Sequence, residues 1–283
     1  MNIFDYTEHE LAGDVLKYEK NPPNLLNTDE AIFIRCDGKA FKNFTKKFEK
    51  PFDSIFRNTM EKTMVYLANE CQCSWMGYTQ SDEITIMLKK PNIDSQIMFG
   101  GRRTKIETFA AATCTLAFNK IFIEEVNKEM AIRKNDLRTS LKMSETEIEE
   151  VVNHEYEKYT NRFLTALFDA RAFNMPKGEE WKVFGWRLLD CHGNAIQMVA
   201  RHNYSIKELQ NKSCSEMKEM IIKNGDNIDN YEQRYMYGRM AIKKEMKMYE
   251  GTERECIRNK FVLENSLTVF ENNYFFGYCP SDI

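Results

Sequence analysis

Acidic residues stand at the ends of two apolar segments. Asp37 follows the run EAIFIRC at 30–36 and precedes Gly38, while Asp82 and Glu83 occupy the turn of GYTQSDEITIML. Carboxylates with open coordination suit Mg²⁺, which keeps several waters and binds phosphate oxygens. Two such ions about 3.5–4 Å apart stabilise the attacking and the leaving oxygen of a phosphoryl transfer. If the two segments are neighbouring strands, these acids predict metal-dependent phosphoryl or nucleotidyl transfer.

Each acidic turn also has a simpler interpretation. Asp37-Gly38 and Ser81-Asp82 are typical turn dipeptides, and either one alone is more simply explained as a turn. The two together, at strand ends of one sheet, favour a metal site. Gly38 lets the backbone approach a ligand, and its carbonyl oxygen is then a further candidate metal ligand, although a plain turn explains this glycine equally well.

Two arginines follow the diglycine of GGRRTKIETFAAA, at the start of a helix expected over 101–128. Free N–H groups and the helix dipole favour anions at such a position. A triphosphate needs such contacts in addition to Mg²⁺. A single lysine in this part of the chain is more typical of a solvated surface. The basic residues considered for phosphate binding are Lys39, Lys42, Lys46, Lys47, Lys50, Arg102, Arg103 and Lys105.

The elements that position these residues alternate between strands and helices. The patterns predict a strand at 30–36, a helix at 53–71, a hairpin in CSWMGYTQSDEITIMLKK, a helix at 101–128, a strand in FDARAF and a helix at 186–202. This order favours an α+β fold: a ferredoxin-like sheet with helices on one face, as in polymerase palms and nucleotide cyclases. Fold alone does not assign a function.

Two further regions complete the expected organisation. The charged stretch 128–160 contains SETEIEEVVNHEYEKY, an acidic helix capped by Ser144, and is interpreted as a solvated surface insertion. We expect residues 1–200 to form the palm-like domain and residues 201–283 to form a helical, basic region packed on it. RYMYGRMAIKK within the second region is interpreted as a basic strand or strand pair.

Composition excludes several classes of protein. The chain has 283 residues, of which 42% are hydrophobic and 29% charged, with a net charge of −3. It has no apolar run of the roughly 20 residues that a membrane span needs, and no basic-then-apolar leader. The eight cysteines form no C-x-x-C pair, which predicts reduced thiols and a cytoplasmic protein. The negative net charge argues against wholesale coating of nucleic acid and leaves room for a local basic groove.

Five blocks of sequence, in order over roughly 30–200, resemble the tRNA-histidine guanylyltransferase superfamily. IRCDGKAFKNFTKKFEKPFD is similar to its N-terminal motif, and GYTQSDEITIML to its Gln-Ser-Asp-Glu hairpin. GGRRTKIETFAAA resembles its Gly-Arg-Arg helix start, FDARAF its Phe-Asp-x-Arg strand, and WRLLDCHGNAI its Trp-Arg-x-x-Asp-Cys helix. Several of these blocks are weak individually, and their common order makes the resemblance specific.

The resemblance implies a palm-like enzyme that adds nucleotides to the 5′ end of tRNA in the 3′–5′ direction. A 5′-monophosphate is first activated by ATP as an adenylate, and the 3′-hydroxyl of an incoming nucleotide, such as GTP, then attacks it. It implies two Mg²⁺ ions held by Asp37, the Gly38 carbonyl and Asp82, with Glu83 as a third catalytic acid. The family also forms tetramers, so we expect a homo-oligomer.

Other residues are assigned through the same resemblance. The implied nucleotide-binding residues are Asp37, Gly38, Lys39, Ala40, Phe41, Lys42, Ser81 and Asp82. The implied contacts to the triphosphate or to the tRNA 5′ end are Lys50, Arg102, Arg103 and Lys105. Residues 201–260 carry more basic than acidic side chains, which suits phosphates of RNA, although a solvated helical face is an equally good explanation. The candidates for tRNA binding there are Arg234, Arg239, Lys243, Lys244 and Lys247.

Departures from the family pattern bear on the substrate. Lys39 stands where the family has Arg, which keeps the charge and loses the planar fork, and Lys42 stands where it has His. The eukaryotic enzymes carry His-Ile-Asn-Asn after Asp-Cys, a motif that goes with selection of histidine tRNA. Here the stretch is His192-Gly193-Asn194-Ala195. This resembles the guanylyltransferase-like branch, which repairs truncated tRNA 5′ ends by copying the opposite strand; His192 is more simply an ordinary helix residue than a catalytic base.

Three alternatives remain open from the sequence. The first is addition of a single G to histidine tRNA. The second is a palm-fold nucleotide cyclase, which needs a nucleoside triphosphate and no RNA; the Lys50-Pro51 and Gly-Arg-Arg blocks argue against it. The third is a catalytically inactive RNA-binding module, against which the intact Asp37, Asp82 and Glu83 argue.

Overall fold

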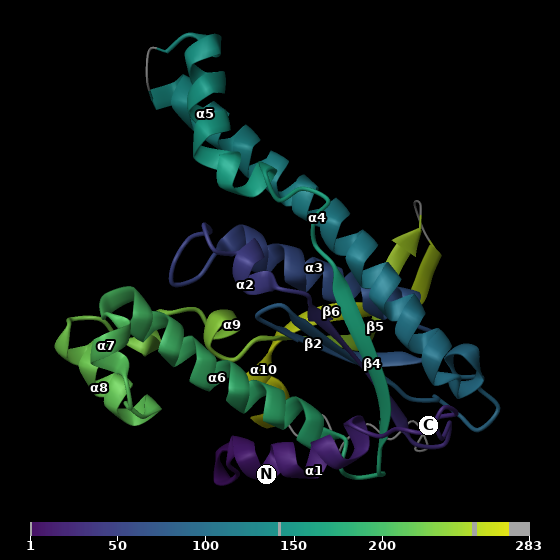
Figure 1. The fold of residues 1–283 in the computed structure, drawn as a ribbon. Helices are drawn as coiled ribbons and strands as arrows, with labels where there is room; N and C mark the ends of the chain where they lie inside the picture. Colours follow the sequence, from purple (N-terminus) through teal and green to yellow (C-terminus); the bar gives the residue numbers. More distant parts are fainter. Residues whose placement is uncertain (1, 141–142, 251–253, 272–283) are drawn as a thin grey trace.

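The protein is built on one six-stranded antiparallel sheet, seen in a computed structural model that describes residues 2–140, 143–250 and 254–271 (Figure 1). The strands are β1 (Ala31–Gly38), β2 (Ser74–Gln80), β3 (Glu83–Leu88), β4 (Phe168–Met175), β5 (Arg239–Glu250) and β6 (Arg254–Asn265). Their order across the sheet is β4-β1-β3-β2-β5-β6. The first four strands have the order 4-1-3-2 of a ferredoxin-like sheet, so the predicted α+β class is confirmed.

Two of the three helices predicted for one face of the sheet lie there. α3 (Ser54–Glu70) begins at Asp53, whose side chain accepts a hydrogen bond from the Phe56 N–H, and α4 (Arg103–Ser140) lies beside it. Ile32, Ile34 and Cys36 of β1 point to this side and are buried against both helices. Alternate residues of a strand face opposite sides of its sheet, so the intervening residues of β1 need a second cover.

That second cover is a difference from the prediction of helices on one face. α1 (Glu8–Glu19) and α6 (Trp181–Asn203) pack on the opposite side, where Phe33, Phe173 and Phe184 form a second core. The reason is visible in β1, whose first six residues are all buried. A strand that is apolar on both faces must be covered on both.

α4 is longer than predicted and ends in a helical hairpin. It continues to Ser140 and pairs with α5 (Glu145–Thr160), which projects from the body (Figure 1). Three ion pairs, Arg133–Glu155, Lys134–Glu149 and Arg138–Glu145, join the two helices along the hairpin. The surface insertion expected at 128–160 is therefore this hairpin. By length and composition α4 is also apolar enough to cross a membrane, but its Ile106, Ala110, Phe118 and Phe122 line the core on the sheet.

The region after residue 200 is only partly helical. α7 (Ile206–Leu209), α8 (Cys214–Lys223) and α9 (Gln233–Met236) pack with the end of α6 into a small lobe. β5 and β6 then join the palm sheet, because Arg239–Ile242 pair with Met76–Thr79 of β2. The strand expected in RYMYGRMAIKK is present from Arg239, whereas the helical structure expected for the rest of 201–283 is replaced by strand in β5 and β6. The remaining short elements are η1 (Ile3–Asp5), α2 (Phe41–Phe44), η2 (Met98–Gly101), η3 (Ile228–Asn230) and α10 (Ser266–Glu271).

Candidate active site

The two acidic turns meet at one end of the sheet. β1 and β3 are hydrogen-bonded neighbours in a register that places Asp37 opposite Glu83. The Gly38 N–H donates a 3.1 Å hydrogen bond to the Asp82 carbonyl oxygen. The two-residue turn closes with Ser81 in the left-handed region, at φ 46°, and the Ser81 hydroxyl donates to Asp82 Oδ1 at 2.9 Å. The pairing that the sequence argument required is present.

The pKa values of Asp82 and Glu83 are both raised. Burial raises the pKa of Asp82, the Ser81 hydrogen bond opposes that rise, and the negative charge of Asp37 adds to it. Burial also raises the pKa of Glu83, while the positive charges of Arg187 and Arg35 lower it. Clustered carboxylates that repel one another are stabilised by a cation bound between them.

The donors at this turn suit Mg²⁺. Asp37 and Asp82 supply two carboxylates, and the Gly38 carbonyl lies on the same strand end. Within the described ranges, no group of three or more His, Cys, Asp and Glu side chains forms a complete metal cage. Mg²⁺ often binds to one or two carboxylates together with substrate phosphates, so a two-acid site open to a triphosphate fits this ion.

Glu83 belongs to a buried ion network rather than to the open site. Its Oε1 accepts a 2.6 Å hydrogen bond from Arg187 Nε, and its Oε2 lies 3.8 Å from Arg35 Nε. Arg35 in turn pairs with Glu19 of α1, and Arg187 pairs with Asp190 of α6 at 2.9 Å. Glu83 is thus held facing two arginines, next to Asp82 and opposite Asp37, which suits it to position these two acids. These arginines were not predicted from the sequence, although the Arg of the Trp-Arg-x-x-Asp-Cys block was a signal.

A fourth acid near the site, Asp169, was not predicted. Asp169 of β4 lies directly opposite Asp37 in the β1–β4 pairing and is exposed. Directly opposed residues of neighbouring strands project to the same face. Asp169, Asp37 and Glu83 therefore form a row across three strands, and the acidic residue of FDARAF was the sequence signal for it.

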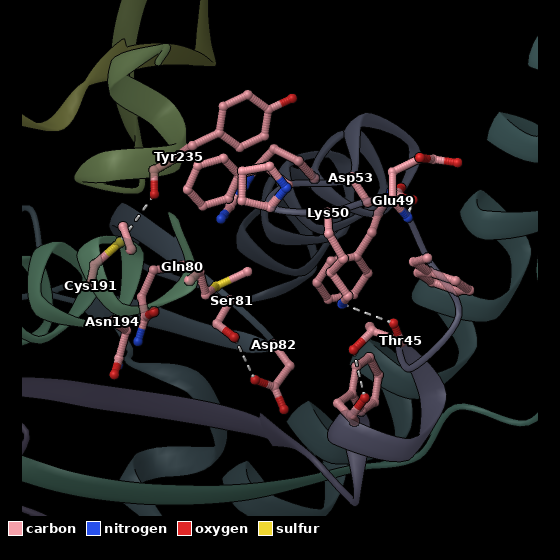
Figure 2. A pocket seen from close by; sticks show the side chains of 18 of the residues that line it. Thr45, Glu49, Lys50, Asp53, Gln80, Ser81, Asp82, Cys191, Asn194 and Tyr235 are labelled. Carbon is pink, nitrogen blue, oxygen red and sulfur yellow. Dashed lines mark hydrogen bonds between the residues drawn. The ribbon is translucent and has the colours of Figure 1, made fainter. Parts of the chain in front are cut away.

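A cavity of about 420 Å³ adjoins the turn of β2 and β3. In Figure 2, Gln80, Cys191 and Asn194 lie on one side and Thr45, Glu49 and Lys50 on the other, with Ser81 and Asp82 between them. The remaining wall is largely aromatic. It comprises Phe41, Phe48, Phe52, Phe56 and Tyr235. A hollow with charged groups at one end and rings along its wall suits a nucleotide.

The predicted nucleotide-binding segment borders this cavity. Gly38 runs into Lys39 and Ala40, which are exposed, and then into Phe41, which is buried. A Cβ at Gly38 would collide with the Phe41 ring, so this position requires glycine for close packing. Lys42 and Lys50 both line the cavity, and Lys50 Nζ donates to the Thr45 carbonyl oxygen at 3.2 Å.

The other predicted phosphate contacts lie at the opposite end of the sheet. Thr115 of α4 lies near the Asp37 end of the sheet, because it accepts a hydrogen bond from the N–H of Phe168, the residue opposite Gly38. Arg102 lies near the other end, because it forms a β-bridge with Leu25, which precedes β1. Arg103 is about 18 Å back along α4 from Thr115, at 1.5 Å per residue. Arg103 binds the Pro22 carbonyl oxygen at 3.0 Å. Within one chain, Arg102, Arg103 and Lys105 are therefore not brought together with Asp37 and Asp82.

The predicted tRNA-binding residues are mostly engaged in contacts of their own. Arg234 contacts Asn58, Glu61 and Glu232, Arg239 donates to Asn265, and Lys244 pairs with Glu264 at 2.6 Å. Lys243 is exposed on β5, with its Nζ 3.4 Å from the Ser74 carbonyl oxygen. The side chain of Lys247 falls outside the described residues.

His192 and Asn194, in the stretch that departs from the histidine-tRNA motif, have different surroundings. The His192 ring stacks on Tyr237 at 4.7 Å between centroids, and its Nε2 lies 3.2 Å from Lys218 Nζ. Asn194, one residue beyond Gly193, is exposed and lines the cavity instead. Burial and the nearby positive charge of Lys218 lower the pKa of His192 to about 4. His192 is thus a neutral packing residue, as the simpler interpretation predicts.

Similar proteins are found both by sequence and by structure. The chain is 25% identical to an uncharacterized protein of Acanthamoeba polyphaga mimivirus, over 89% of this chain and 84% of that one. It is 24% identical to the tRNA(His) guanylyltransferase of Debaryomyces hansenii, over 81% and 80%. A bacterial Thg1-like protein in complex with ATP superposes with a TM-score of 0.68 at 24% identity, covering 89% and 90%; a complex with GTP gives 0.62 at 23% identity, with the same coverage. The family model described as tRNAHis guanylyltransferase (Thg1) matches residues 13–176, so the chain belongs to the tRNAHis guanylyltransferase family.

Proposed function

We propose that this protein transfers nucleotides to the 5′ end of tRNA in the 3′–5′ direction, and that it repairs truncated 5′ ends against the opposite strand. The observation that carries the proposal is that Asp37 lies beside the turn of Asp82, and that Asp82 lines the cavity. Membership of a family of tRNA nucleotidyltransferases supports the reaction class. The relatives' complexes with ATP and GTP support nucleoside triphosphates as substrates.

Some residues of the site would bind the metal ion and the phosphates, and others would hold these residues in position. Asp37, Asp82 and the Gly38 carbonyl would hold Mg²⁺, which supplies Lewis acidity at the attacking hydroxyl and neutralises phosphate charge. Lys42 and Lys50 line the cavity and are placed to bind phosphate oxygens. Glu83 and Arg187 hold the turn that carries Asp82. Phosphoryl transfer needs mainly positioning and electrostatic stabilisation, so no His or Cys nucleophile is required.

Template-directed repair is favoured over single G addition by the residues of α6. The histidine-tRNA motif is interrupted by Gly193 and Ala195, and His192 packs against Tyr237 and Lys218. A half-buried ring that is already stacked on another ring is poorly placed to contact an RNA base. Asn194 and Ala195 of this group line the cavity, and of these two Asn194 is exposed.

The test is a nucleotide-addition assay on tRNA transcripts lacking their first 5′ nucleotide. Each transcript, with a 5′-monophosphate or 5′-triphosphate, is incubated with Mg²⁺ and one of the four nucleoside triphosphates. Addition only of the base complementary to the opposing nucleotide is the expected result. Addition of G whatever the opposing base would favour the histidine-tRNA reaction, and a cyclic product without tRNA would favour the cyclase. No incorporation on any transcript would refute the proposal.

A further inference from the structure

One buried cation in the cavity wall has no role in the reaction described so far. Arg57 of α3 is only 7% exposed and lines the cavity beside Asp53 and Phe56. Its Nε and Nη1 atoms have no hydrogen-bond partner among the described residues. A buried guanidinium without acceptors is costly, so a residue of this kind indicates a missing ligand.

The surroundings of Arg57 do not supply the missing acceptors. Glu61, one helical turn further along α3, forms its ion pair with Arg234 at 3.7 Å. Burial raises the pKa of Glu61, and the positive charges of Arg234, Arg57 and Arg239 oppose that rise. Among the described residues no hydrogen bond or ion pair joins Glu61 to Arg57, and Arg239 donates to Asn265. Arg57 itself has a ring contact, with its guanidinium carbon 6.0 Å from the centre of the Tyr235 ring. Its Nε and Nη1 are covered by protein and make no hydrogen bond among the described residues, so the guanidinium is free to turn towards an occupant of the cavity.

The position of Arg57 indicates which part of a nucleotide it meets. Phosphates belong at the end of the cavity formed by Asp82, Lys42 and Lys50, where Mg²⁺ and lysines bind them. The base then lies along the aromatic wall, where the Tyr235 ring stacks on Phe52 at 4.8 Å between centroids. Base-on-ring stacking accepts any of the four bases, so discrimination needs a polar group. Arg57 is the buried cation against this wall.

Arginine has five donors and no acceptor, and this decides what it selects. Guanine presents O6 and N7, and uracil presents O4, all of them acceptors; adenine and cytosine carry an amino donor in place of that keto oxygen. We infer that Arg57 reads the nucleobase in this cavity and favours the keto bases, guanine and uracil, over the amino bases, adenine and cytosine. This inference rests on the proposed nucleotide site and adds a specificity-determining residue to it. Base pairing to a template would act on top of this preference.

The test measures equilibrium binding of GTP, UTP, ATP and CTP with Mg²⁺ in the absence of tRNA, by calorimetry on the full chain. For Arg57→Met we expect affinity for GTP and UTP to fall roughly tenfold, as for the loss of a good arginine–base contact. ATP and CTP should change by less than about twofold, within the noise of an unaltered contact. Retained ATP binding then also shows that the cavity is folded.

Two further variants serve as a second test and as a control. Arg57→Lys keeps the charge and loses the planar fork, so it should weaken binding of GTP and UTP more than binding of ATP and CTP. It replaces Arg57→Met as the test variant if Arg57→Met does not fold. Arg201→Met removes an exposed arginine from the same cavity and should weaken all four nucleotides alike. Equal losses for the four nucleotides in both Arg57 variants, or no loss, would overturn the inference. If the wild type discriminates the bases but adds no nucleotide to tRNA, the proposed reaction fails while the base-reading role stands.

Discussion

Arg187 Nε and Glu83 Oε1 are joined by a 2.6 Å hydrogen bond across the interface between α6 and the sheet. Removing one partner of a buried pair leaves an uncompensated charge, which costs about 3–5 kcal/mol. Arg187→Met should therefore lower the free energy of unfolding by about 3 kcal/mol, since Arg35 still faces Glu83. Urea denaturation measures this loss.

The control for that variant is Arg133→Met, which breaks the exposed pair with Glu155 on the α4–α5 hairpin. Exposed ion pairs contribute about 1 kcal/mol or less. Equal losses for the two variants would show that the buried network has no special role in holding the turn of Asp82.

Asp82→Asn separates activity from stability. Burial and the charge of Asp37 raise the pKa of Asp82, so the ionised form is disfavoured in the fold, and a neutral amide should leave the melting temperature unchanged or higher. Nucleotide addition should fall roughly a thousandfold, because a metal ligand supplies several kcal/mol. Asp94→Asn, on an exposed loop, is the matched control and should keep full activity. Near wild-type addition by Asp82→Asn at saturating Mg²⁺ would remove Asp82 from the catalytic site.

Because His192 takes up a proton less readily in the folded chain, we expect the free energy of unfolding to depend on pH. Its pKa is lowered from 6.5 to about 4 by burial and by Lys218, so the unfolded chain takes up a proton more readily than the folded one. This contribution to stability is complete above pH 6.5 and is lost as the pH falls towards 4, by up to roughly 3 kcal/mol. His192→Phe keeps a ring against Tyr237, and its free energy of unfolding should fall less than that of the wild type between pH 7 and 4.5. Parallel curves for the two proteins would contradict this role.

Although Arg102 and Arg103 are adjacent, we expect them to differ in how much they contribute to stability. Arg103 Nη1 and Nη2 donate to the Pro22 carbonyl oxygen and to Asn24 Oδ1, and thus tie the segment before β1 to α4. Arg103→Met should cost about 1–3 kcal/mol in unfolding free energy, because it removes two hydrogen bonds donated by a charged group. Arg102 is exposed, and Arg102→Met should change stability by less than about 0.5 kcal/mol. Thermal and urea unfolding distinguish the two, and a larger loss for Arg102 would reverse the assignment.

Lys243 is the most accessible of the predicted tRNA contacts whose side chains are described. If it binds a phosphate, Lys243→Gln should weaken tRNA binding and reduce the slope of log affinity against log salt by about one. Filter binding at several salt concentrations measures the slope. Lys128→Gln, an exposed lysine on α4, should leave it unchanged. An unaltered slope for Lys243→Gln would exclude this face of β5 from the RNA interface.

The local pattern of the sequence determined most of what lies close in the chain. The Gln80–Glu83 turn, the Asp53 cap of α3 and the Ser144 cap of α5 follow from turn residues, capping residues and alternating apolar positions. The meeting of Asp37 and Asp82 could also be inferred, because strand order in a ferredoxin-like sheet leaves few alternatives.

Tertiary structure alone decided the features that depend on distant neighbours. Nothing local shows that Glu83 faces Arg187 of α6, or that Arg103 holds Pro22 at the far end of the sheet. The sequence predicts a basic strand in RYMYGRMAIKK, but only the fold shows that this strand pairs with β2 and extends the palm sheet. Arg57 looks like any helix-surface arginine until the cavity buries it. Burial and pairing across the chain are set by packing, and a single sequence records packing only indirectly.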